Sequence, residues 1–415
     1  MQAELRRTVL SFDEPFPAAR GAAVLVFIAA ALLFSNLVRL QAAGSDEIPF
    51  RKHTIDLGRS ESVSVADINQ DGRLDIVSGE NWYEQARPAQ KGDGPGWIKH
   101  HFRDLGYTSG YIEDLSDLAI DVNGDGYPDI VSCSYWDEPL TWWENPGAQD
   151  KPWRKTIIQT GSPVEFAFLV DLLNTGKATQ LLPQFGDENF PLSWYEITGK
   201  GPGAKWVRHI VDPHSYGHGI GAGDINKDGR NDIITPKGWF EAPSDPRNGK
   251  WIFHPEFDLG VTGFIYVEDV NGDGLPDVVT SMAHNYGIFW YEQKKNSDGS
   301  RSWIKHAIDD VWSQAHAMTL VGLKHDGTTD LVTGKRYFAH EHDPGANEPL
   351  GVYWYEPVQS NGQLQWIRHI IDYSSRAGGG MQIPVVDIDG DGDLDIVVAG
   401  KSGLFLFENL TIDRH

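Results

Sequence analysis

The chain has 415 residues and a formal net charge of −24, because 59 Asp and Glu residues face only 35 Lys and Arg residues. This negative charge disfavours a nucleic acid or an anionic membrane surface as a partner. Cys133 is the single cysteine, so no internal disulfide can stabilise the fold.

The first 43 residues read as a targeting segment. A polar stretch with Arg6, Arg7 and Arg20 precedes an apolar run at residues 21 to about 38, and small residues follow at 42 and 43. This order is typical of an export signal. The run is also long enough for an uncleaved single-span anchor. We therefore expect residues 44–415 to be an exported domain, periplasmic or extracellular, that contacts a membrane only through such an anchor.

A nine-residue loop recurs along the rest of the chain. Five full copies carry Asp at positions 1, 5 and 9, Asn or Asp at position 3 and Gly at position 6, and two degraded copies begin at Asp171 and Gly322. Several hard oxygen ligands on one tight turn suit Ca²⁺, so we expect about five calcium sites that serve as structural staples. The predicted calcium ligands are Asp67, Asn69, Asp71, Asp75, Asp121, Asn123, Asp125, Asp129, Asp224, Asn226, Asp228, Asp232, Asp269, Asn271, Asp273, Asp277, Asp387, Asp389, Asp391 and Asp395.

Two further marks follow each loop and define the repeating unit. An aromatic pair, or Leu-Phe in the last copy, precedes a Glu in all seven units, as in Trp82-Tyr83-Glu84. A Trp-led strand follows it in the first six units, as in WIKHH from Trp97. Four short strands per unit and seven units predict an all-β, seven-bladed β-propeller. The last unit lacks its fourth strand, and residues 50–56 (FRKHTID) are expected to supply it and to close the ring.

The Asp loop resembles that of FG-GAP/VCBS repeat proteins, which include the integrin alpha-chain propeller, over residues 50–410. A narrower resemblance is to the propeller domain of aldos-2-ulose dehydratase. It rests on HGIGAGDINKDGRND from His218, QAHAMTL from Gln314, GKRYFAHEHDPG from Gly334 and GGGMQIPVVDIDGDGDLD from Gly378. That resemblance implies a zinc-assisted elimination on a keto-sugar within the propeller. No segment here resembles the cupin domains of the fungal enzyme, so only a propeller-borne activity carries over.

The histidines fall into two groups. Six occupy one register of the fourth strand, and a residue repeated in this way is expected to be structural: His53, His100, His209, His254, His306 and His369. His218 and His316 instead lie six residues before an Asp loop, where the first strand of a blade begins. Because the second strand runs back, the loop after it reaches the same face. That loop carries His284 in one unit and His340 and His342 in the next.

These positions suggest a metal site. Glu165 occupies the same register as His218 and His316, and two imidazoles with one carboxylate suit Zn²⁺ with open positions for substrate. His284 or His340 would then be the base and the leaving-group acid. Lys335, on the longest loop, is expected to bind the hydroxyls or carboxylate of a sugar acid, as are Lys401 and Lys237.

Two functions remain open from the sequence. The first is a metal-dependent lyase or dehydratase acting on a keto-sugar or related carbohydrate at the rim of the fourth to sixth blades. The second is a non-catalytic propeller that binds a glycan or a protein through the same face. The convergent histidines favour the first, and the lack of an established catalytic triad or paired-carboxylate motif favours the second.

Overall fold

The computed structural model describes residues 47–87, 96–149, 151–338, 340 and 342–412. The fold is that of the compact unit Ile48–His415. The predicted targeting segment at residues 1–43 lies outside the described residues. Within the described residues, no helix is both long enough and apolar enough to cross a membrane.

The described chain is built from strands and one short 3₁₀ helix. In chain order these are β1 (Phe50–Asp56), β2 (Ser64–Ala66), β3 (Asp75–Ser78), β4 (Asn81–Ala86), β5 (Gly96–His101), β6 (Tyr107–Thr108), β7 (Tyr111–Ile112), β8 (Ser116–Ile120), β9 (Asp129–Cys133), β10 (Leu140–Glu144), β11 (Arg154–Gln159), β12 (Val164–Val170), β13 (Gln180–Phe185), β14 (Leu192–Thr198), η1 (Gly201–Gly203), β15 (Lys205–Asp212), β16 (Ile220–Gly223), β17 (Asp232–Thr235), β18 (Gly238–Glu241), β19 (Ile252–His254), β20 (Thr262–Glu268), β21 (Asp277–Met282), β22 (Tyr286–Lys295), β23 (Arg301–Ser313), β24 (Met318–Val321), β25 (Asp330–Gly334), β26 (Gly351–Ser360), β27 (Gln363–Tyr373), β28 (Val385–Val386), β29 (Asp395–Gly400) and β30 (Gly403–Asn409).

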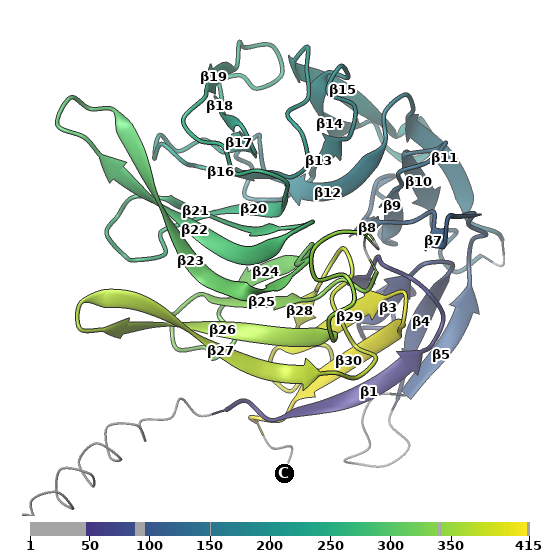
Figure 1. Ribbon diagram of the computed structural model, residues 1–415. Helices are drawn as coiled ribbons and strands as arrows, with labels where there is room; N and C mark the ends of the chain where they lie inside the picture. Colours follow the sequence, from purple (N-terminus) through teal and green to yellow (C-terminus); the bar gives the residue numbers. More distant parts are fainter. Residues whose placement is uncertain (1–46, 88–95, 150, 339, 341, 413–415) are drawn as a thin grey trace, which may run out of the picture. The chain divides into compact units, whose positions relative to one another are not determined.

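These strands form a propeller-like ring of sheets, which confirms the all-β prediction (Figure 1). Five sheets are separate four-stranded blades: β2–β5, β8–β11, β12–β15, β24–β27, and β28–β30 with β1. Strands β16–β19 and β20–β23 form one eight-stranded sheet, and β6 and β7 form a small hairpin. β1 pairs antiparallel with β30 from Phe50↔Asn409 onwards, so the segment at residues 50–56 supplies the outer strand of the last sheet, as predicted.

The repeated histidines have a shared structural role. Five of them stack on the Trp directly opposite in the neighbouring strand, with ring centroids 3.9–4.4 Å apart: Trp82–His100, Trp194–His209, Trp239–His254, Trp290–His306 and Trp354–His369. Each ring also faces the Glu that follows the aromatic pair, as in the 2.8 Å contact between His100 Nε2 and Glu84 Oε2. In the last sheet, His53 contacts Glu408 at 2.6 Å. This cross-strand pairing explains why the aromatic-Glu and Trp-led motifs recur together.

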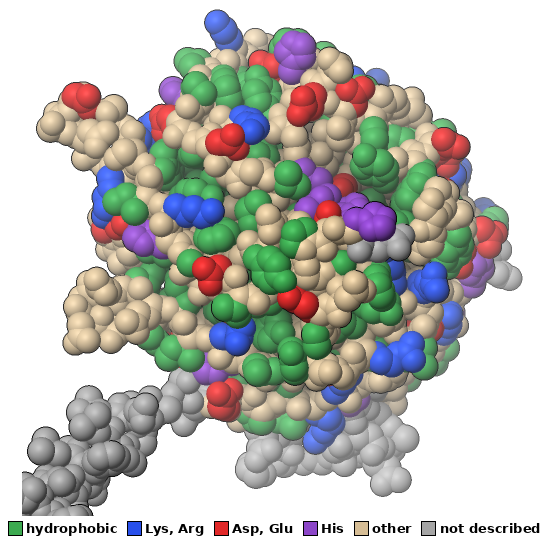
Figure 2. Space-filling view, in the orientation of Figure 1, with side chains coloured by type: hydrophobic (Ala, Val, Ile, Leu, Met, Phe, Trp, Pro, Cys, Tyr) green, Lys and Arg blue, Asp and Glu red, His purple; other side chains and the backbone are tan. Residues whose placement is uncertain are grey.

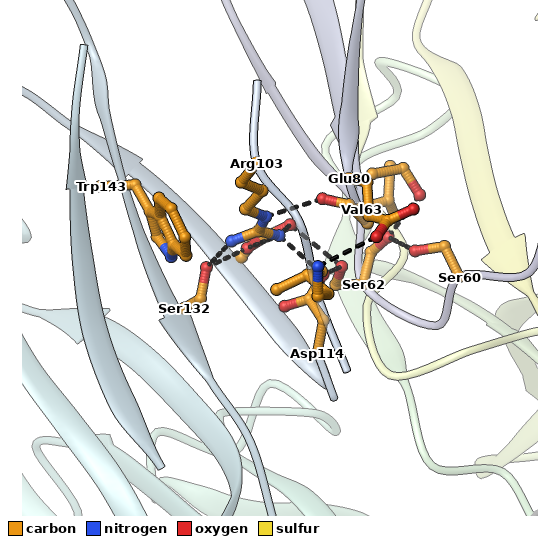
Figure 3. Close-up of polar contacts among 12 residues, drawn as sticks. Ser60, Ser62, Val63, Glu80, Arg103, Asp114, Ser132 and Trp143 are labelled. Carbon is orange, nitrogen blue, oxygen red and sulfur yellow. Dashed lines mark hydrogen bonds and ion pairs between the residues drawn. The ribbon is translucent and has the colours of Figure 1, made fainter. Parts of the chain in front are cut away.

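A fully buried cation joins the sheet β2–β5 to the sheet β8–β11 (Figure 3). Arg103, which follows β5, places Nη2 2.8 Å from Asp114 Oδ2 and 2.9 Å from Asp117 Oδ2. Its Nε donates to Gly79 O at 2.8 Å, and Ser62 Oγ lies within hydrogen-bond distance of both carboxyl groups. Burial, opposed by Arg103 and reinforced by the neighbouring Asp117, raises the pKa of Asp114 well above its usual range. Two buried carboxyl groups therefore share one guanidinium.

This arrangement predicts unequal effects of two substitutions. Arg103→Met leaves two buried carboxyl groups without a counter-ion and should lower the free energy of unfolding by about 3–5 kcal/mol. Asp114→Asn keeps an acceptor for Ser62 and should change it by about 1 kcal/mol or less at neutral pH. Because the folded-state pKa of Asp114 lies above the unfolded value, the wild type loses stability as pH rises through that pKa, and Asp114→Asn should remove this loss. Urea unfolding across pH measures both effects. Equal destabilisation by the two variants would contradict this account.

Candidate functional site

Four side chains from three sheets converge at one place. Glu165 lies in β12, and His316 lies just before β24. His284 lies between β21 and β22, and His340 lies between β25 and β26. One potential ligand atom from each of the four lies within 4.8 Å of the others. Figure 2 shows histidine side chains gathered near the middle of this face. The structure thus brings together histidines from strand starts and from returning loops, as the sequence register predicted.

The Nε2 atoms of the three cluster imidazoles lack hydrogen-bond partners among the described residues. Nε2 of His284, of His316 and of His340 is buried, and none has a hydrogen-bond partner among the described residues. Ring centroids are 4.1 Å apart for His284–His340 and 5.3 Å apart for His284–His316. Buried polar atoms are normally satisfied, so three orphan nitrogens in one cluster need an explanation. Three imidazoles beside a carboxylate match the donor set that Zn²⁺ prefers.

The same three imidazoles are held neutral. Burial lowers the pKa of His284 to about 3, with His218 and His340 adding to the effect. Burial, followed by the nearby Arg336 guanidinium, lowers the pKa of His316 well below its usual range and also lowers that of His340. A neutral imidazole is the form that binds a metal.

His218 has different partners. Its Nδ1 lies 2.6 Å from Thr262 O, and its Nε2 lies 2.8 Å from Glu165 Oε2. Burial lowers the pKa of His218, but the Glu165 carboxylate and the hydrogen bonds outweigh burial, so the pKa is raised overall. Both ring nitrogens of His218 therefore face hydrogen-bond acceptors. It was predicted as a zinc ligand, and here its Nε2 is directed to Glu165.

Arg336 fixes the other side of Glu165. Its Nη1 donates to Glu165 Oε1 at 2.9 Å, and its Nε donates to Glu61 Oε1 at 2.7 Å. Arg336 is only 1% exposed. Burial raises the pKa of Glu165, but His218 and Arg336 together bring it well below the usual range. The sequence placed Arg336 on the longest loop but did not single it out, and that loop length was the available signal.

The three predicted lysines lie apart from the cluster. Lys335 is buried, and its Nζ donates to Ser313 Oγ at 2.7 Å and lies 3.5 Å from Glu348. Lys237 forms an exposed ion pair with Asp258. Lys401 donates to Phe338 O at 2.6 Å. His342 is exposed and is not a member of the cluster.

A cavity of about 450 Å³ opens beside the cluster. Its walls include Glu165, Arg336 and three of the histidines, together with aromatic side chains. Gln184 also lines it, and its Oε1 is buried without a partner among the described residues. This volume lies within the range of pockets that hold small ligands, about 300–1,000 Å³. The lining residues include Tyr111, Tyr135, Trp136, Gln184, His218, His284 and His340.

The Asp loops adopt one repeated conformation. In the first, Asp67 accepts hydrogen bonds from the backbone N–H groups of Asp71 and Gly72, at 3.0 and 2.9 Å. The position-6 glycine has a φ of 86°, which a side chain would strain. The position-9 carboxylate, Asp75, is buried and accepts from Ile68 and Gln85. In the loop that begins at Asp387, oxygens of three carboxylates lie within 4.8 Å of one another: Asp387, Asp389 and Asp395.

Comparisons with known proteins support the fold. Residues 322–398 match the FG-GAP-like repeat family. No curated protein matches the chain. Among solved structures, BBS1N in complex with ARL6DN has a TM-score of 0.51 at 12% identity, covering 89% of this chain and 98% of that one. The rhamnogalacturonan lyase PL11 of Bacillus licheniformis has a TM-score of 0.43 at 11% identity, covering 88% and 75%. An Agrocybe aegerita lectin that recognises non-reducing terminal N-acetylglucosamine has a TM-score of 0.32 at 16% identity, covering 86% and 81%. The match to BBS1N shows similarity of fold alone, and the family match covers an FG-GAP-like repeat at residues 322–398.

Proposed function

We propose that the chain is an exported, seven-bladed FG-GAP/VCBS propeller that catalyses an elimination on a keto-sugar. Zn²⁺ would bind at the cluster of Glu165, His284, His316 and His340, which we call the axial cluster. The observation that carries the proposal is the set of three buried, unpartnered Nε2 atoms beside Glu165. His284, His316 and His340 would hold the metal, with Glu165 as a fourth donor. This assignment exchanges the roles expected from the sequence, because His284 and His340 become ligands and His218 becomes the proton-transfer group.

The count of seven blades depends on the eight-stranded sheet. In the strand order its halves are joined by a short parallel pairing of β16 with β20, at Ile220↔Phe264 and Gly221↔Ile265. Gly221 allows this close approach, since a Cβ there would lie 1.8 Å from Ile265 O. Each half also has its own Asp loop and aromatic-Glu motif. These features support two blades that touch at the axis, and the narrower resemblance to the aldos-2-ulose dehydratase propeller is part of the same proposal.

The chemistry follows from the residues around the cavity. Zn²⁺ held by the three histidines and Glu165 would supply a Lewis acid that polarises a carbonyl and acidifies the neighbouring C–H bond. His218 lines the cavity, and in its neutral form Nε2 can accept the proton from carbon and return it to the leaving hydroxyl. Thr262 O holds Nδ1 and so fixes the orientation of the ring. The aromatic side chains of Tyr111, Tyr135 and Trp136 form one wall of the cavity, here called the aromatic wall, and would exclude water from one side of the substrate.

The alternative is a propeller that binds a glycan or a protein without catalysis. The aromatic wall favours glycan binding over protein binding, because Tyr135 is 49% exposed beside Trp136 in the cavity. A protein that binds zinc and sugar but shows no elimination would support this alternative.

Zinc content tests the ligand set. His316→Ala and His340→Ala should each lose bound zinc, since each removes a ligand. His218→Gln should retain zinc with an affinity at most about 100-fold lower, the usual effect of a residue that orients a ligand. Metal analysis after dialysis against zinc-free buffer measures this. His306→Ala, on the outer Trp290 stack, is the matched control and should match the wild type.

Two outcomes separate the assignments. Zinc retained in both His316→Ala and His340→Ala would rule out the proposed set. Loss of zinc in His218→Gln and His316→Ala, with retention in His340→Ala, would favour the set expected from sequence, Glu165, His218 and His316.

We also propose that the five full Asp loops bind Ca²⁺. Without the ion, several carboxylates on one turn repel each other. Chelation should lower the melting temperature, and Ca²⁺ at 100 times the Kd should contribute about 2.7 kcal/mol per site. Calorimetry with and without chelator measures the shift. Asp224→Asn should reduce the calcium-dependent part, whereas Asp171→Asn, in a degraded loop, should leave it unchanged. A melting temperature that chelation does not alter would show that the loops need no ion.

A further inference from the structure

A second cavity adjoins the axial one. It has a volume of about 350 Å³ and shares Ser109 and Tyr111 with the first cavity. These two residues belong to the hairpin β6–β7, whose turn carries positive φ angles at Ser109 and Gly110. Each cavity alone is of the size that holds one small ligand. Two adjoining cavities therefore allow a ligand longer than a single sugar ring.

The lining of the second cavity is positively charged, although the chain as a whole is negatively charged. Arg59 and Lys401 line it, and the lining residues that the structure describes include no Asp or Glu. Lys401 Nζ lies 3.4 Å from the centroid of the Tyr111 ring, so the cation stacks on the wall between the two cavities. Burial lowers the pKa of Lys401 to about 8, which keeps the amine largely protonated at neutral pH. In a chain of net charge −24, two cations without a lining acid select an anionic group.

Aromatic side chains line both cavities. Tyr337 and Phe338 in the second are each 37% exposed, with ring centroids 4.4 Å apart. In the first, the Trp136 ring lies 5.8 Å from Tyr111. Exposed rings in a cleft offer flat apolar surfaces on which sugar rings stack. The unpartnered Gln184 Oε1 in the first cavity adds an acceptor for a hydroxyl.

We infer that the ligand is an acidic oligosaccharide that spans both cavities. A hexuronate carboxylate binds Arg59 and Lys401, while the adjoining sugar ring lies against Tyr111 and reaches the histidine cluster. This inference rests on the proposed function for the reaction at the cluster. The recognition of the carboxylate depends only on the second cavity, whose cations contact none of the proposed zinc ligands.

Binding of matched sugars tests the inference. The probes are a panel of hexuronate trisaccharides, each paired with its carboxyl-reduced neutral twin, titrated calorimetrically into the full protein. At least one acid should bind about tenfold or more tightly than its twin, the discrimination that one charge-assisted hydrogen bond provides. The double variant Arg59→Gln, Lys401→Met should bring that ratio close to one. Arg59→Gln alone changes an exposed side chain and should lower the ratio without affecting folding. Lys237→Met is the matched control and should leave the ratio unchanged.

Three results would overturn the inference: equal binding of acid and twin, no binding by any acid, or a preference that survives in the double variant. Zinc analysis of the same samples separates this failure from failure of the proposed function. If the protein prefers the acidic sugar but binds no transition metal, the proposed enzyme function is wrong and the assignment of an acidic oligosaccharide ligand stands. If the protein binds zinc but does not prefer the acidic sugar, only the assignment of an acidic oligosaccharide ligand is wrong.

Discussion

The axial site depends on one buried cation, Arg336, that pairs with two glutamates. A guanidinium that is 1% exposed is tolerated only if carboxylates compensate its charge, and Arg336 meets this need through Glu61 and Glu165. The three residues come from three sheets and lie 275 and 171 positions apart in sequence. Closing the ring is what brings them together. Because Arg336 occupies one oxygen of Glu165, the other oxygen is left to orient His218.

Features that repeat along the chain could be predicted from the sequence. Trp82 and His100 lie opposite each other because both belong to adjacent antiparallel strands, and the same pair recurs in other blades. The same cross-strand Trp–His pair therefore accounts for the motif in several blades, and its repetition in the sequence is enough to predict it. The closing role of β1 followed from a similar argument, since the last unit lacked one strand and residues 50–56 resembled it. Local spacing was sufficient in both cases.

Partner choice within the site could not be predicted in this way. His218 and His316 occupy the same register, yet only His218 has a carbonyl at 2.6 Å and a carboxylate at 2.8 Å. Nε2 of His316 has neither among the described residues. The difference arises from Thr262 and Glu165, which neighbouring blades contribute. Register places two imidazoles at equivalent positions, but groups from other blades decide whether the pKa of each is raised or lowered.

The directions in which the side chains of the longest loop point could not be predicted from the sequence either. Lys335 and Arg336 are adjacent, and successive side chains of an extended chain point to opposite sides. The structure directs Lys335 to Ser313 and Glu348, and Arg336 to the two axial glutamates. A shift of one residue would exchange them, and a compact ammonium cannot make the forked contacts that a guanidinium makes with two carboxylates. The choice of Arg at position 336 therefore follows from the pair of glutamates that it must reach, and those glutamates are identifiable only once the ring is closed.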